Sequence, residues 1–112
     1  MLARIMGLKT ISPQDLLALV QGSRVTTFDV NSPQSWARAH VPGALNLDAG
    51  FKESELPPDK NSAVVFYCSS FLCTKAPNAA LRAKRMGYTN VHVMSAGISG
   101  WLAAGLPTQA QA

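Results

Sequence analysis

Apolar residues along the chain follow patterns that predict strands and helices in turn. A continuous apolar run at residues 63–67 predicts a strand that is buried on both faces of a parallel sheet. Shorter segments that mix apolar and polar residues predict further strands at residues 25–30, 44–47 and 91–94. Helical patterns separate most of these runs, so the strands are expected to be joined by crossover connections.

Two Ser-Pro pairs mark the starts of helices. Ser12 and Ser32 can each cap a helix with their hydroxyl groups, and the prolines that follow suit the first helical position. An apolar stripe follows the first pair up to Gly22, a natural stop, and the second pair opens a short helix that contains Trp36. Two further helices are predicted at residues 77–86 and 98–104.

This alternation favours an α/β fold in three layers, with a mainly parallel sheet flanked by helices on both faces. We treat residues 1–112 as a single domain, because this length suits one domain with its own core. The polar segment 48–62 is expected to be a surface connection, and the tail from Thr108 is expected to fray. Ligands of such sheets bind beyond the carboxyl ends of the strands. Cys68 directly follows the most buried strand.

Composition and charge narrow the classes of function. Hydrophobic residues make up 47% of the chain and charged residues 14%, which is typical of a globular protein. The net charge is +4, and the densest basic group is Lys75, Arg82, Lys84 and Arg85. We interpret this group as a solvated helix face that can steer an anion. The basic group lacks the interleaved aromatic residues on which nucleic-acid bases would stack, which argues against nucleic-acid binding. No apolar run reaches the length of a membrane span. Residues 1–10 lack the features of a secretory signal, so we expect a cytoplasmic protein.

The candidate chemistry lies in the loop that follows the buried strand. Residues 68–75 run from Cys68 to Lys75 and lead into a helix. Backbone N–H groups, the helix N-terminus and a nearby cation would all lower the pKa of a thiol held there. The position alone leaves an inert, buried cysteine as an alternative. Asp29 ends a neighbouring strand, where it can orient loop groups or make a structural hydrogen bond.

Three ordered motifs point to a known family. They are Phe28-Asp29-Val30, then residues 40–47, and finally residues 87–91 together with 97–101 and 104–107. With them, nearly the whole chain resembles the single-domain rhodanese-like sulfurtransferases. The resemblance implies the rhodanese-like fold, with Cys68 as the sulfur acceptor and no cofactor. The Cys68 thiolate would take a sulfane sulfur from a donor such as thiosulfate, and a thiol or cyanide would then collect it.

The resemblance also implies a substrate-binding set around the thiol. Backbone amides of residues 69–73 would hold the persulfide, so the expected set is Ser69, Ser70, Phe71, Leu72, Thr74 and Lys75. Many family members carry an arginine five residues after the cysteine, where Cys73 stands here. Lys75 is the nearest cation and binds oxyanions less well than a guanidinium group. Related phosphatases need an arginine at the end of this loop, which argues against phosphatase activity.

Cys73 admits several interpretations. The chain is similar to a rhodanese-like subgroup with a second cysteine inside the loop, in a Cys-x4-Cys arrangement. Cys73 can be a resolving thiol that attacks the persulfide, releases sulfide and leaves a disulfide. It can also share the transferred sulfur, or simply pack under the loop. A zinc site built from both cysteines with His40 and His92 is disfavoured because no close His or Cys pair accompanies them, so no metal is expected.

The leading hypothesis is a sulfurtransferase or persulfide carrier that uses Cys68. Two alternatives remain: a catalytically silent rhodanese-like binding module, and a thiol–disulfide redox protein that uses Cys68 and Cys73. The expected partners are a small sulfur-donor anion or thiol, and also a sulfur-accepting protein or a thiol reductant. Nucleic acid and membranes are not expected as partners.

Overall fold

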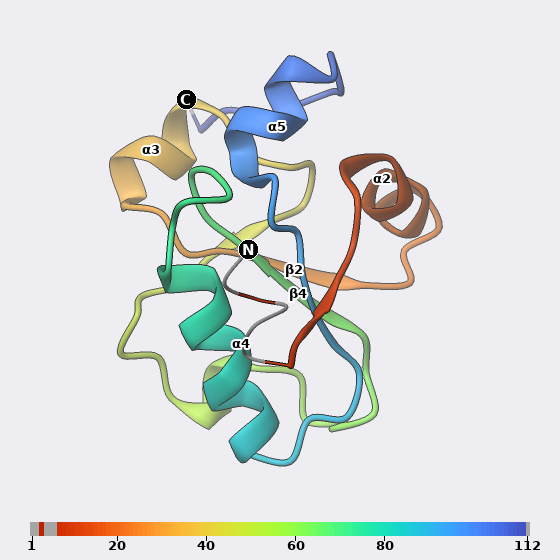
Figure 1. Ribbon diagram of the computed structural model, residues 1–112, viewed down its shortest axis with the longest axis vertical. Coiled ribbons are helices and arrows are strands. Elements are labelled where there is room, and N and C mark those ends of the chain that lie inside the picture. Colours follow the sequence, from red (N-terminus) through yellow and green to blue (C-terminus); the bar gives the residue numbers. More distant parts are fainter. Residues whose placement is uncertain (1–2, 4–6, 112) are drawn as a thin grey trace.

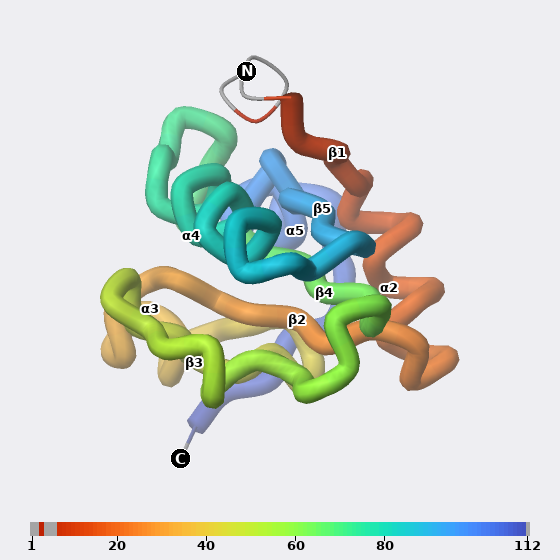
Figure 2. Tube along the Cα trace, turned by 90° about the horizontal axis from the view of Figure 1, so that it is seen from below, coloured from red at the N-terminus to blue at the C-terminus, as the bar shows by residue number. Residues whose placement is uncertain are grey.

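A parallel sheet forms the centre of the molecule in the computed structural model, which describes residue 3 and residues 7–111. The elements are β1 (Lys9–Thr10), α2 (Pro13–Gln21), β2 (Thr26–Asp29), α3 (Pro33–Arg38), β3 (Leu45–Asn46), η1 (Glu53–Glu55), β4 (Val64–Tyr67), α4 (Lys75–Arg85), β5 (Val91–Val93) and α5 (Gly97–Ala103). The strand order is β1-β5-β4-β2-β3 (Figure 2), and every neighbouring pair is parallel. The α/β class predicted from the sequence is confirmed. The expectation of a cytoplasmic protein used residues 1–10, and half of these lie outside the described residues.

The central strand β4 separates two apolar clusters. Val64 and Phe66 pack in one cluster with the alanines of α4, whereas Val65 and Tyr67 pack in the other with residues of α2 and α5. In Figure 1, α4 lies below the strands and α2 and α5 lie above them. All four residues of β4 are buried, as the apolar run predicts. Because side chains alternate along a strand, Cys68 belongs to the α4 side.

Local signals placed the helix starts correctly. The Ser12 hydroxyl accepts a hydrogen bond from the Asp15 amide at 3.1 Å, and the Ser32 hydroxyl accepts one from the Ser35 amide at 3.2 Å. Strand β1 was not predicted from the sequence. It contains two residues, too few to show a periodicity, and its identity comes from pairing with β5 through the Lys9–His92 register.

The segment 48–62 is a structural part of the fold rather than only a surface connection. Its Phe51 and Leu56 are buried in the α4-side cluster. The Arg82 guanidinium donates to the carbonyls of Ala49 at 2.7 Å and Phe51 at 2.8 Å, and it lies 4.3 Å from the centre of the Phe51 ring. The expectation of a freely solvated basic face is therefore wrong for Arg82, because this side chain ties the segment to α4.

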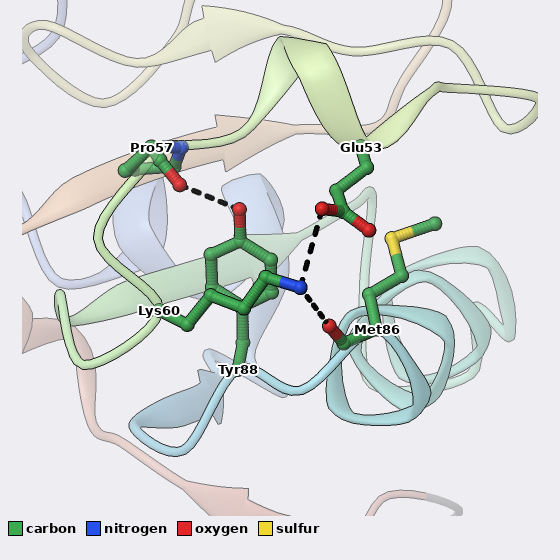
Figure 3. A network of polar contacts seen from close by, with 5 residues as sticks. All are labelled: Glu53, Pro57, Lys60, Met86 and Tyr88. Atoms are coloured by element: carbon green, nitrogen blue, oxygen red, sulfur yellow. Dashed lines mark hydrogen bonds and ion pairs between the residues drawn. The ribbon is translucent and has the colours of Figure 1, made fainter.

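A second group of contacts fastens the same segment near the end of α4 (Figure 3). Lys60 forms an ion pair with Glu53 at 3.2 Å and donates to the carbonyl of Met86 at 2.5 Å. A cation at this carbonyl complements the negative end of the α4 dipole. The Tyr88 hydroxyl donates to the carbonyl of Pro57 at 2.5 Å. These contacts explain how a polar, proline-containing segment keeps a defined path.

The C-terminal tail is paired, so the expectation that it frays from Thr108 is also wrong. Gln109 forms an antiparallel bridge with His40, with N–H···O distances of 3.0 and 2.9 Å. The side-chain oxygen of Gln109 accepts from the Gly43 amide at 2.8 Å, and the Gln111 amide donates to the Ala37 carbonyl at 2.8 Å. In Figure 1, the end of the described tail lies beside α3. Backbone pairing with a distant turn holds the tail, and residue type alone does not reveal such a contact.

Candidate active site

Cys68 lies where the sequence places it, at the carboxyl end of the central strand. Cys68 directly follows β4 and is 2% exposed. The loop that follows leads after six residues into α4, whose first turn contributes the buried Ala76 and Pro77. The site therefore occupies the edge of the sheet at which parallel α/β folds bind ligands.

Cys68 and Cys73 are joined in a disulfide, with their Cα atoms 6.4 Å apart. This separation is within the usual range for such a bond. Cys73 is partly buried and packs against the α4-side cluster. The loop thus brings the two sulfur atoms together, which the sequence left open. In this form the Cys68 sulfur is not a free nucleophile, and a reductant has to open the bond first.

A small cavity adjoins the disulfide. Its volume is about 10 Å³, and its wall includes both cysteines, Ser70 and Phe71 of the loop, and Ser95 after β5. This volume is near the lower limit for one water molecule. The rest of the wall is mostly apolar and is formed by Ala3, Ala76, Pro77, Val93 and Met94. The cavity can hold a single small atom or group beside the sulfurs.

The start of α5 fixes the backbone around Cys68. The Ile98 amide donates to the carbonyl of Cys68, and the Ser99 amide donates to the carbonyl of Ser69, both at 2.9 Å. Gly97 has a φ of +65°, and a Cβ atom there would lie 2.6 Å from the carbonyl carbon of Ser69. Only glycine allows this close approach of backbone to backbone. The sequence motif contains Gly97, but sequence reasoning gave it no role at the thiol.

Asp29 belongs to a buried hydrogen-bond chain beside the site. Its carboxylate accepts from the Tyr67 hydroxyl at 2.7 Å and from the Asn31 amide at 2.8 Å, and the Tyr67 oxygen accepts from the Val41 amide at 3.0 Å. Burial raises the pKa of Asp29 above its ordinary value, although these hydrogen bonds oppose that effect. Asp29 therefore anchors the residue before Cys68, which fits the structural role weighed from the sequence.

The expected substrate-binding residues are not all gathered at the sulfurs. Ser70 and Phe71 line the small cavity, whereas Lys75 lines a separate cleft of about 280 Å³ beyond β2 and β3. Leu72 is 78% exposed, and Ser69 and Thr74 are exposed as well. Within the loop, the Cys73 amide donates to the Ser70 carbonyl at 3.0 Å, so this amide is already engaged.

His40 takes a structural position. His40 Nδ1 lies 2.6 Å from the carbonyl oxygen of Trp36, and its ring stacks on the Trp36 ring. Since a carbonyl only accepts, Nδ1 carries the proton. Burial, and to a lesser degree Lys9, lowers the pKa of His92.

Two absences concern the described ranges, residue 3 and residues 7–111. No three His, Cys, Asp or Glu side chains cluster there as metal ligands. None of the helices there combines the length and the apolar character that a membrane span needs.

Comparison with known proteins gives a consistent family. The sequence profile of the rhodanese-like domain matches residues 12–104. The HTH-type transcriptional regulator Rv0324 of Mycobacterium tuberculosis is 31% identical over 87% of this chain, which spans 43% of the regulator. The human thiosulfate:glutathione sulfurtransferase is 27% identical, with 86% of this chain and 95% of the relative covered. The thiosulfate sulfurtransferase GlpE of Haemophilus influenzae is 29% identical, with 91% and 95% covered.

Solved structures agree on the fold. The BH2092 protein of Bacillus halodurans superimposes with a TM-score of 0.81 at 18% identity, covering 91% of this chain and 77% of that one. At this identity the likeness concerns the fold alone.

Proposed function

Because the chain belongs to the rhodanese-like domain family, we propose that it is a sulfurtransferase or persulfide carrier that uses the Cys68 sulfur. The observation that carries this proposal is the placement of Cys68 at the end of β4, with its sulfur beside a cavity large enough for one small atom. Two relatives that the chain covers almost end to end are named thiosulfate sulfurtransferases, which supports the same activity.

The proposed reaction starts from the reduced loop. A thiol reductant opens the Cys68–Cys73 disulfide by two successive exchange steps, which leave both cysteines reduced and the reductant oxidised. The Cys68 thiolate then attacks the outer sulfur of thiosulfate. The S–S bond of thiosulfate breaks, sulfite leaves with the bonding electrons, and Cys68 carries a persulfide. An acceptor thiolate or cyanide attacks the outer sulfur and restores the Cys68 thiolate.

A steady-state assay tests this activity. The reduced protein is given thiosulfate with glutathione or cyanide as acceptor, and the release of sulfite is measured. Glutathione is the first acceptor to try because the name of the human relative contains it. Sulfite release that is lost in Cys68→Ser supports the proposal. No release above the Cys68→Ser background with either acceptor would contradict it and favour a catalytically silent binding module.

The disulfide favours a second candidate function, in which Cys73 acts on the Cys68 sulfur. In a resolving step, the Cys73 thiolate attacks Cys68 Sγ and the persulfide S–S bond breaks. The outer sulfur leaves with the bonding electrons and takes up a proton from water to become hydrosulfide. The same pair can also exchange with external dithiols without any sulfur transfer, as a thiol–disulfide redox protein does. Both schemes end in the disulfide form.

Sulfide release separates these schemes. Reduced protein loaded from thiosulfate should release one sulfide per disulfide formed if Cys73 resolves the persulfide, and Cys73→Ser should retain its sulfur. Disulfide exchange with glutathione in a protein that never gains sulfur would instead assign a purely redox function. Retention of the persulfide by the wild-type protein would exclude Cys73 as a resolving thiol.

A further inference from the structure

Ser95 presents a buried hydroxyl that makes no hydrogen bond. Among the side-chain oxygen and nitrogen atoms of the described residues, its Oγ is the one that is buried without a partner. Burial of a hydroxyl without a hydrogen bond costs free energy, so a group of this kind needs an explanation. Nothing in the rhodanese-like motifs of the sequence points to this position.

The pairing of β4 with β5 brings Ser95 near Cys68. In the parallel pairing of β4 with β5, Phe66 is in register with Val93, and the Met94 amide donates to the Phe66 carbonyl at 3.0 Å. Cys68 directly follows the end of β4, and Ser95 lies shortly after the end of β5, where the chain turns into α5. Both residues line the cavity of about 10 Å³.

The cavity offers a persulfide few polar side chains. Ser70 and Ser95 carry the hydroxyl groups among the residues that line it, and Lys75 lines the separate cleft instead. The outer sulfur of a persulfide is anionic at neutral pH and about the size of one water molecule. An anion in such a cavity needs a hydrogen-bond donor, and hydrogen bonds to charged groups are the stronger ones.

We infer that Ser95 is a positioning residue whose hydroxyl donates a hydrogen bond to the sulfur carried by Cys68, first the thiolate and then the outer atom of the persulfide. This inference rests on the proposed function. The unsatisfied hydroxyl is then a group that lowers stability in the disulfide form and finds its partner only in the reduced and sulfur-loaded forms.

The test uses Cys73→Ser as the parent, because this variant cannot resolve its persulfide. Ser95→Ala, Ser95→Thr and the control Ser54→Ala, which changes an exposed hydroxyl in η1, are added to it. Persulfide decay is followed by intact mass, and the thiolate fraction of Cys68 is followed by the pH dependence of alkylation. Ser95→Ala should lose the persulfide faster and lower the thiolate fraction at neutral pH by about tenfold, the equivalent of one hydrogen bond to a charged group. Ser95→Thr, which keeps a hydroxyl, should stay close to the parent.

Thermal unfolding separates this role from a structural one. Because the hydroxyl has no partner in the disulfide form, Ser95→Ala in the otherwise wild-type, oxidised protein should unfold at the same temperature or higher. If Ser95→Ala has the same persulfide lifetime and the same alkylation profile as the parent, the role of Ser95 is overturned but the proposed function is not. A parent that gains no sulfur would overturn the proposed function, and the Ser95 assignment with it.

Discussion

Gly97 provides the sharpest test of how the fold holds Cys68. In Gly97→Ala, the new Cβ would lie 2.6 Å from the carbonyl carbon of Ser69 and 2.7 Å from the Ser70 amide nitrogen. These are backbone atoms, so a side-chain rotation cannot relieve the contact. The φ of +65° adds a second cost, because an L-residue there is strained by about 1–2 kcal/mol.

Gly105→Ala is the matched control. Gly105 has a similar φ of +70°, but a Cβ there meets nothing within 4 Å. The unfolding free energy of this variant should therefore fall by about 1–2 kcal/mol, the cost of the backbone strain alone. Gly97→Ala should lose about 1–3 kcal/mol more, the usual cost of forcing extra atoms into a packed site.

Urea unfolding followed by tryptophan fluorescence measures both losses, and alkylation of the reduced protein reports on Cys68. We expect Gly97→Ala alone to change the alkylation rate, because relief of the contact must move the loop that follows Cys68. Equal destabilisation of the two variants, with an unchanged alkylation rate in both, would refute the idea that the start of α5 positions the thiol.

Three further predictions concern the groups that support the site. Arg82→Met should destabilise the fold by about 1–2 kcal/mol in urea unfolding, because two carbonyls of the connecting segment lose their donor, whereas the exposed Lys84→Met should change stability by less than about 0.5 kcal/mol; equal effects would contradict the role of Arg82. Tyr67→Phe should cost about 1–3 kcal/mol by the same measurement, because a buried amide and the Asp29 carboxylate lose their partner. Burial raises the folded pKa of Asp29 above 3.8, so this group stabilises the fold below its unfolded pKa, and that contribution is lost as pH rises through the folded pKa. Asp29→Asn should therefore gain stability relative to wild type as the pH is raised across this range, and a constant difference would show that the pKa of Asp29 is not raised.

Local patterns predicted much of the framework. Ser12 and Ser32 cap their helices through neighbouring residues, and the apolar run of β4 identifies a strand buried on both faces. The position of Cys68 follows from that strand, because parallel sheets bring their functional groups to the carboxyl ends. These features depend on residues close together in the sequence, so the sequence alone could reveal them.

Features that depend on distant residues could not be predicted in this way. The contact of Arg82 with the Phe51 carbonyl joins residues 31 positions apart, and the bridge between Gln109 and His40 joins residues that are even farther apart in the sequence. The proximity of Ser95 to Cys68 depends on the register between β4 and β5. A basic residue, a glutamine and a serine carry no local signal for such contacts.

The central claim is that Cys68 accepts a sulfane sulfur, and intact mass after thiosulfate treatment tests it most directly. Reduced Cys73→Ser protein is incubated with excess thiosulfate, freed of small molecules and weighed without reductant. The account predicts a gain of one sulfur atom per chain. Cyanide should reverse this gain, and the double variant that carries Cys68→Ser as well as Cys73→Ser should not show it. An unchanged mass in Cys73→Ser, with Cys68 shown to be reduced and open to alkylation, would contradict it.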